Sequence, residues 1–183
     1  CRRQANYTML TKRQMFLEHC AQTSSEPMGL EIVKAKGTKL WDSEGKEYID
    51  FISGISVNNT GHLNPLVVNA INNQLKEFSY LMVYGEYIHS PQVKLSKYLS
   101  DQLPEPLNST FIVNSGSEAI EGALKLAKRV TGRAKVMAFN KSYHGSTYGA
   151  MSLGGEYERK QAFMPGVPGV VNVDYNDLKS LDQ

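Results

Sequence analysis

The sequence lacks the residues that build a disulfide-stabilised fold or a metal centre. Among its 183 residues only Cys1 and Cys20 are cysteines, which are too few for a disulfide framework. The 4 histidines are scattered without the spacing of metal ligands, so we expect no metal site.

Long apolar runs and an excess of one charge are also missing. No stretch approaches the roughly 18 apolar residues of a membrane-spanning helix, and no apolar segment follows the arginines near the start. Lysine and arginine total 20 against 18 for aspartate and glutamate, which excludes the concentrated basic face of a nucleic-acid binder. Because 41 % of the residues are hydrophobic, the chain is not disordered. We expect a cytoplasmic protein with no membrane and no nucleic-acid partner.

The first third of the chain has the pattern of a small α+β segment. Residues 1–10 include a natural start at Met9, and we expect them to form a tail that is native or added upstream. A short helix is predicted over 11–21, and short strands over 32–35, 39–41 and 47–51 are separated by tight turns. This close spacing predicts an antiparallel meander, and we assign 11–62 to one segment.

From residue 63 onward, helices alternate with strands. Asn64-Pro65 and Ser90-Pro91 are typical helix starts, and the clearest helix is predicted over 117–131. Apolar runs at 110–113, 135–139 and 169–174 are predicted strands, and their alternation with helices indicates a parallel α/β sheet. Three strands are too few to complete such a sheet, so we interpret 63–183 as the first part of a larger domain.

A Ser-Gly-Ser turn joins the strand predicted at 110–113 to the strong helix that follows. The first amides of a helix have no intrahelical partners and attract anions, and Gly116 lets an anion approach the backbone. Ser115 and Glu118 also form the pattern of a capping box, which needs no ligand. The spacing alone leaves phosphate binding and plain capping equally open.

A second polar loop, 140–147, follows the next predicted strand and is expected at the same edge of the sheet. Tyr143 has the shape to stack on a planar ring, and His144 is able to donate a hydrogen bond. Taken alone, a turn with a packed aromatic is the simpler explanation of this loop. The two loops together favour a ligand with a phosphate at one end and a ring at the other.

These motifs, in this order, resemble those of the class III aminotransferases, which are pyridoxal-phosphate enzymes of fold type I. The resemblance rests on NSGSEA at 114–119, LKLAK at 124–128, YHG at 143–145, DxxGKxYIDFxSGI at 42–55 and GHxxP at 61–65. It extends from about Thr11 to the end and is greatest for the acetylornithine and ornithine aminotransferase branch. It implies an α/β fold: an incomplete three-layer α/β/α large domain over 63–183, which binds pyridoxal 5'-phosphate, preceded by an α+β small-domain segment.

The resemblance also implies an activity and its partners. The enzyme would move an amino group from an amine or ω-amino acid to a keto acid, and it would act as a homodimer. The Schiff-base lysine and the aspartate that pairs with the pyridine nitrogen are expected beyond Gln183. We therefore expect no catalytic residue within this chain, and no activity from it alone.

By the same resemblance, Gly116 and Ser117 hold the cofactor phosphate, with Ser115 beside them. Tyr143 stacks on the pyridine ring, and His144 shapes the loop.

Three further residues are expected at the substrate. Ile55 and Val57 would border the substrate entrance. Ser146 stands where the family usually has an arginine that binds a substrate carboxylate, and a serine is unable to replace a guanidinium.

Other functions use the same loops. An aminomutase, a racemase or a decarboxylase of this fold would bind the cofactor in the same way, and a phosphate-binding module would have no chemistry of its own. A serine hydrolase would need a Gly-x-Ser-x-Gly elbow, which 114–118 does not supply.

Overall fold

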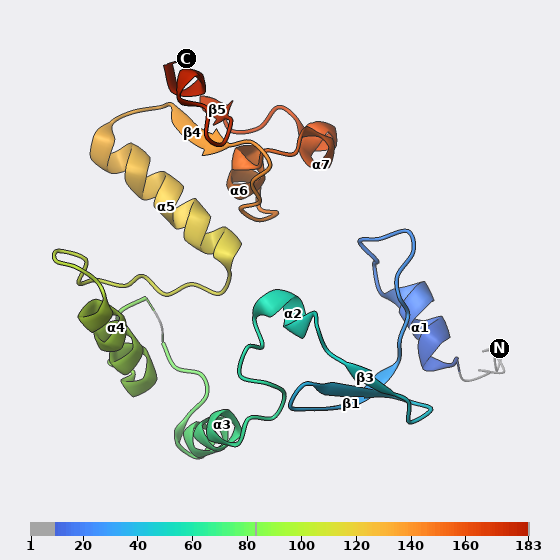
Figure 1. Ribbon diagram of the computed structural model, residues 1–183. Helices are drawn as coiled ribbons and strands as arrows, with labels where there is room; N and C mark the ends of the chain where they lie inside the picture. Colours follow the sequence, from blue (N-terminus) through green and yellow to red (C-terminus); the bar gives the residue numbers. More distant parts are fainter. Residues whose placement is uncertain (1–9, 83, 183) are drawn as a thin grey trace, which may run out of the picture. The chain divides into compact units, whose positions relative to one another are not determined.

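The computed structural model describes residues 10–82 and 84–182, which fall into two compact units, 1–87 and 88–183 (Figure 1). Of the tail expected over 1–10, only Leu10 belongs to the described residues. The domain boundary expected between residues 62 and 63 stays a prediction. None of the helices found in the described ranges has the length and apolar character needed to cross a membrane.

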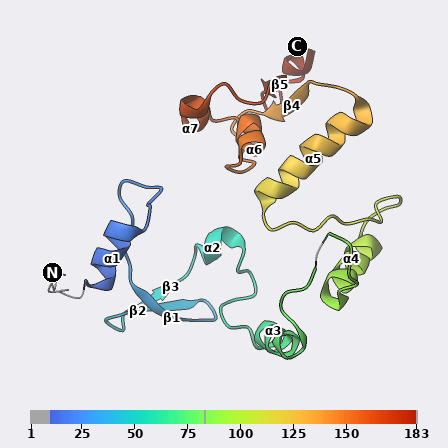
Figure 2. The ribbon, with the colours of Figure 1, turned by 180° about the vertical axis from the view of Figure 1, so that it is seen from behind.

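The first unit contains the predicted antiparallel meander, visible from both sides in Figures 1 and 2. Helix α1 (Lys12–His19) precedes strands β1 (Ile32–Lys36), β2 (Lys39–Asp42) and β3 (Glu47–Ile49), which pair in the order β1-β2-β3. The turn between β2 and β3 forms because the Asp42 carboxylate accepts the amides of Glu44 and Lys46 at 3.0 and 2.9 Å. The short turn α2 (Ser53–Ser56) and helix α3 (Pro65–Glu77) follow.

The second unit contains the predicted parallel pairing. Strands β4 (Val136–Phe139) and β5 (Val170–Val173) lie parallel, in register from Val136 opposite Val170 to Phe139 opposite Val173. The helices are α4 (Ser90–Gln102), α5 (Gly116–Thr131), α6 (Tyr148–Leu153) and α7 (Tyr157–Lys160), with 3-10 turns η1 (Gln161–Phe163) and η2 (Leu178–Asp182).

The strand predicted over 110–113 is not formed. This apolar run has β propensity, but a strand also needs a neighbouring strand to bond to its backbone. Within residues 84–182 only β4 and β5 pair, and neither bonds to 110–113, so this part of the prediction is wrong.

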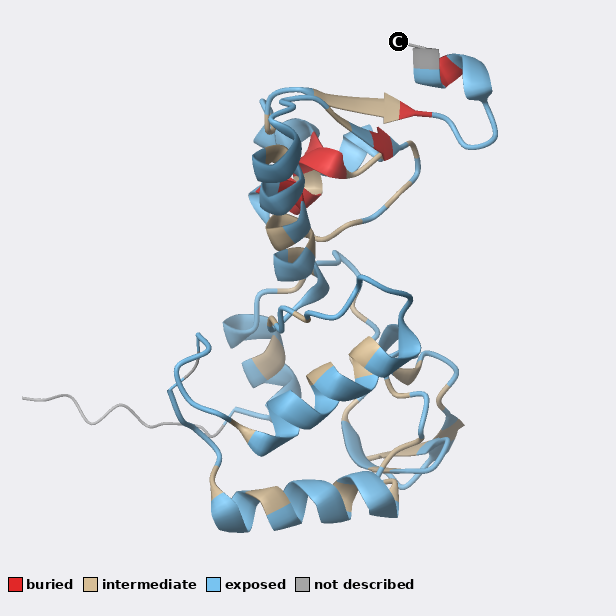
Figure 3. Cartoon of the chain, turned by 90° about the vertical axis from the view of Figure 1, so that its left-hand side faces the viewer, coloured by how far each residue is buried: buried red, intermediate tan, exposed pale blue. Residues whose placement is uncertain are grey.

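The core of the second unit lies between α5, β4 and α6, where Figure 3 shows most of the buried residues. Leu124, Ala138 and Leu153 form a buried cluster, and partly buried Ile120 and Val136 pack against it. This contact holds the first half of α5 against β4 and α6. It thereby brings the start of α5 and the loop that follows β4 to one place.

Apolar side chains of the first unit remain largely uncovered. Ile71 and Leu75, on one face of α3, are both more than half exposed, at 54 and 60 %. No residue among 10–82 is classed as buried (Figure 3). A face of this kind is normally covered in a complete domain, which agrees with the expectation that the chain is part of a larger one.

Candidate functional site

The start of α5 is capped by side chains, with half of the capping box that the sequence pattern suggests. The Ser115 hydroxyl accepts the Glu118 amide at 3.1 Å, and the Glu118 carboxylate accepts the Asn114 amide at 2.7 Å. These bonds do not use the first two amides of the helix itself. Over the described ranges, the backbone N–H groups of Gly116 and Ser117 have no protein acceptor. Capping and anion binding are therefore compatible, because each uses different amides.

Gly116 lies beside open space. A Cβ built on it would meet no atom within 4 Å, and its φ is not positive, so neither packing nor backbone conformation demands glycine there. The positive end of the α5 dipole points at this space. A helix start with two free amides and room in front of them is a suitable site for a phosphate group.

The second loop begins at the carboxyl ends of the two parallel strands. The Asn140 amide donates to Val173 O at 2.8 Å, and the Asn140 side-chain amide donates to Asp174 at 2.7 Å. The rings of Phe139 and Tyr175 stack with their centroids 4.4 Å apart. These contacts fix the position from which 140–147 departs.

This loop then reaches the start of α5. The Ser146 amide donates to the Ser117 hydroxyl at 3.3 Å. Gly145 has a φ of 126°, and a Cβ on it would lie 2.8 Å from the Ser117 Cβ and closer still to its hydroxyl. Close approach and backbone conformation therefore both require glycine at 145.

Tyr143 lies on the exposed side of the same loop. Its side chain is 70 % exposed, and its hydroxyl lies 3.1 Å from the Ser146 hydroxyl. His144 is half-buried beside it. The structure thus brings the loop that carries Tyr143, His144 and Ser146 together with Ser117 and the neighbouring helix start.

Glu121, which the sequence marks only as an acidic residue near the start of a helix, joins these parts from the second turn of α5. Its carboxylate accepts the amides of Gly149 and Ala150 at 2.8 and 3.2 Å. A hydrogen bond from the Thr147 side chain, more than the two amides, holds the pKa of the Glu121 carboxyl below its usual range. No local pattern could have revealed this contact, since its partners lie 26 to 29 residues away along the chain.

Ile55 and Val57, the residues predicted at the substrate entrance, lie in the first unit. They are 86 and 79 % exposed. Ser53, Gly54, Ile55 and Ser56 all have positive φ, at 47, 62, 62 and 66°. This is a left-handed turn, which is strained for a β-branched residue such as Ile55.

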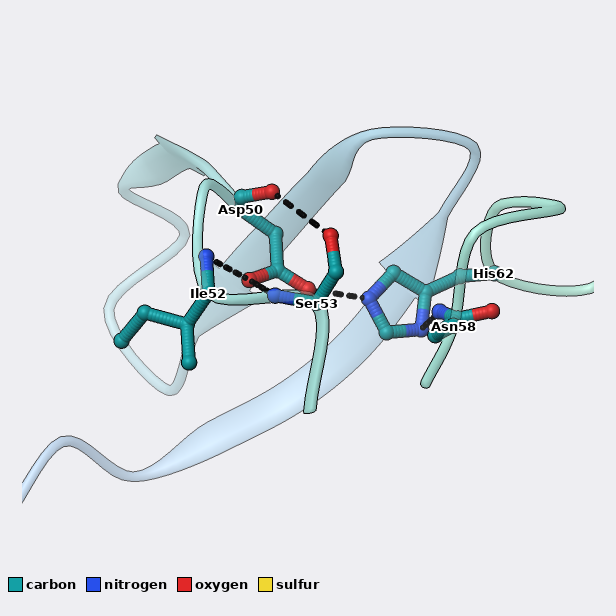
Figure 4. A network of polar contacts seen from close by, with 5 residues as sticks. All are labelled: Asp50, Ile52, Ser53, Asn58 and His62. Carbon is teal, nitrogen blue, oxygen red and sulfur yellow. Dashed lines mark hydrogen bonds and ion pairs between the residues drawn. The ribbon is translucent and has the colours of Figure 1, made fainter. Parts of the chain in front are cut away.

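A polar network holds this turn (Figure 4). One Asp50 oxygen accepts the amides of Ile52 and Ser53 at 3.1 and 2.8 Å, and the other lies 2.7 Å from Nε2 of His62. Nδ1 of His62 lies 2.9 Å from the Asn58 side-chain amide nitrogen, so the ring contacts polar groups on both of its nitrogens. The Ser53 amide, followed by His62, lowers the pKa of Asp50.

Comparison with known proteins gives one consistent result. A family model described as aminotransferase class-III matches residues 20–183. Acetylornithine aminotransferase of Methanopyrus kandleri is 38 % identical over 152 residues, which cover 83 % of this chain and 39 % of that protein.

Two solved structures have a similar fold. Taurine:2-oxoglutarate aminotransferase from Bifidobacterium kashiwanohense, in complex with PLP and glutamate, has a TM-score of 0.80 and 32 % identity over 92 % of this chain and 38 % of that one. Adenosylmethionine-8-amino-7-oxononanoate aminotransferase from Methanocaldococcus jannaschii has a TM-score of 0.84 and 27 % identity over 93 % of this chain and 42 % of that one. This chain therefore spans about two fifths of the length of the proteins it matches.

Proposed function

The chain belongs to the class III aminotransferase family, and on that basis we propose that it is the cofactor-phosphate part of a pyridoxal-phosphate-dependent aminotransferase. The whole enzyme moves an amino group from an amine or ω-amino acid, of the acetylornithine or ornithine type, to a keto acid. The names of the relatives support this class of substrate.

One observation carries the proposal: the amides of Gly116 and Ser117 lack acceptors within the described residues and lie at a helix start with open space before it. A phosphate dianion placed there accepts both amides and is stabilised by the helix dipole. The hydroxyls of Ser115 and Ser117 already accept backbone amides, at 3.1 and 3.3 Å, and their protons remain available to the phosphate. The residues present therefore fit the phosphate of pyridoxal phosphate.

Tyr143 provides the contact for the ring. Its exposed side chain is accessible to a stacking partner, and its hydroxyl contact with Ser146 ties the end of the side chain to the loop. His144 supports the loop from its half-buried position. When bound, pyridoxal phosphate supplies the electron sink that amino-group transfer requires. The lysine that binds it and the aspartate at its ring nitrogen are expected beyond Gln183.

The substrate side is proposed from the two remaining features. Ile55 and Val57 present exposed apolar surface on a turn that the Asp50 network fixes, so they suit the border of an entrance. Ser146 offers a hydroxyl in place of a guanidinium, so a cation from outside this chain would bind the substrate carboxylate. We further propose, from the family resemblance, that the enzyme is a cytoplasmic homodimer.

A donor comparison tests the activity. The full-length protein is supplied with pyridoxal phosphate, 2-oxoglutarate and, in turn, N-acetylornithine, ornithine and a diamine without a carboxylate. We expect glutamate to form with at least one of the two amino acids, and the 1–183 segment alone to form none. Consumption of the donor without glutamate formation would indicate a decarboxylase or an aminomutase. Equal use of the diamine and both amino acids would overturn the proposed carboxylate contact.

A further inference from the structure

Glu121 connects two parts of the candidate site that lie far apart in the sequence. It belongs to α5, one turn beyond the free amides of Gly116 and Ser117. Its carboxylate accepts the amides of Gly149 and Ala150 at the start of α6, directly after the loop that carries Tyr143.

The Glu121 carboxylate packs directly against Gly149. A Cβ on Gly149 would lie 2.8 Å from the carboxyl carbon of Glu121 and overlap one of its oxygens. Gly149 and Ala150 are both buried, so the two amides depend on a protein acceptor. Together with the contact of Gly145 on Ser117, this joins the second half of the loop to α5, while its first residue, Asn140, is held by Val173 and Asp174.

The position of the loop relative to the helix start matters for one kind of ligand. A phosphate and an aromatic ring in one small molecule are a fixed distance apart. Binding both ends at once therefore needs the α5 amides and Tyr143 to be held at a matching separation. A ligand that consists of the phosphate alone has no such requirement.

We propose that Glu121 is a positioning residue that holds the Tyr143 loop at the correct place beside the α5 phosphate site, and so sets the affinity for ligands with both a phosphate and a ring. The inference depends on the proposed function, since it assumes that the phosphate and ring are bound by these two parts. A merely structural Glu121, which only caps α6, would affect folding stability and leave this selectivity unchanged.

The test compares two probes on the full-length protein in its cofactor-free form. Pyridoxine 5'-phosphate has the ring and the phosphate but no aldehyde, so it reports non-covalent binding only, and inorganic phosphate reports the α5 site alone. We expect Glu121→Ala to weaken pyridoxine 5'-phosphate binding about tenfold, the scale of losing hydrogen bonds to a charged acceptor. Inorganic phosphate should bind as it does to the wild type. Glu121→Gln, which keeps an acceptor oxygen, should recover part of the loss.

The matched control is Glu158→Ala. Glu158 is an exposed glutamate of α7 in the same unit, and we expect both probes to bind this variant as they bind the wild type. If Glu121→Ala does not fold, Glu121→Gln carries the test. Amide hydrogen exchange at Gly149 and Ala150 should then be faster in that variant, and its selectivity for pyridoxine 5'-phosphate over phosphate should be lower.

The possible results distinguish a failure of the positioning role of Glu121 from a failure of the proposed function. If the wild type binds both probes and Glu121→Ala and Glu121→Gln keep its selectivity, the positioning role is wrong while the proposed function stands. If both probes weaken equally, Glu121 supports the fold only, and the inference is again wrong. If the wild type binds neither probe, the proposed function fails and the inference falls with it.

Discussion

Replacing Gly116 by alanine tests whether glycine is required at this position for folding stability or for ligand binding. The new methyl group would enter space with no atom within 4 Å, and the φ of Gly116 is not positive. Alanine is also a better helix former than glycine, by up to about 1 kcal/mol in a helix interior and less at the first position. We therefore expect the melting temperature of Gly116→Ala to equal or slightly exceed that of the wild type.

The phosphate affinity of Gly116→Ala, in contrast, should be lower than that of the wild type. A methyl group on Gly116 keeps an anion away from the amides of Gly116 and Ser117, which the described structure leaves without acceptors. A hydrogen bond to a charged group contributes about 1.5–3 kcal/mol. The loss of one such bond corresponds to a roughly 10- to 100-fold weaker affinity for inorganic phosphate and for pyridoxine 5'-phosphate.

The assay is a thermal melt and a calorimetric titration of each variant, with Gly132→Ala as the control. Gly132 ends α5 with a φ of 67° and also has nothing within 4 Å of a built Cβ. Alanine there costs roughly 1–2 kcal/mol for the left-handed backbone and should leave phosphate affinity unchanged. The reasoning is refuted if Gly116→Ala lowers stability and keeps phosphate affinity, because Gly116 would then serve the fold alone.

Three further predictions concern the ring contact, the strained turn and the substrate. Tyr143→Ala should weaken cofactor binding by about 1–3 kcal/mol. Tyr143→Phe loses only the hydroxyl contact with Ser146, so its effect should be milder. If the alanine variant retains the cofactor on dialysis as well as the wild type does, Tyr143 is only a packing residue. Because the Ser53 amide and His62 lower the pKa of Asp50, its contribution to stability is present above pH about 4 and is lost as the pH falls through the folded-state pKa. Thermal melts from neutral to acid pH should therefore fall more steeply for the wild type than for Asp50→Asn, and parallel curves would contradict this. Ser146→Arg should leave kcat/KM for N-acetylornithine unchanged or lower it, since two cations would crowd one carboxylate; a clear increase would show that no other cation serves this site.

The parts of the fold that follow from local chemistry could be predicted from the sequence. The sequence predicts a helix over 117–131, and α5 occupies Gly116–Thr131, because Ser115 caps its start and Gly132 takes the left-handed conformation at its end. The meander was predictable because its turn depends on a local contact between Asp42 and nearby amides.

The parts that depend on tertiary partners could not be predicted in this way. The run 110–113 has the composition of a strand, yet strand formation depends on a neighbour and not on propensity. Glu121 finds its amide partners only once the Leu124 cluster has packed α5 against α6. The left-handed turn runs against the preference of Ile55, and only the folded contacts of Asp50 explain it.

A crystal structure of the full-length protein with pyridoxal phosphate would show whether the α5 helix start binds the cofactor phosphate. We expect phosphate oxygens about 3 Å from the backbone nitrogens of Gly116 and Ser117, with the pyridine ring stacked on Tyr143. A phosphate bound elsewhere, with those two amides facing water, would contradict this expectation.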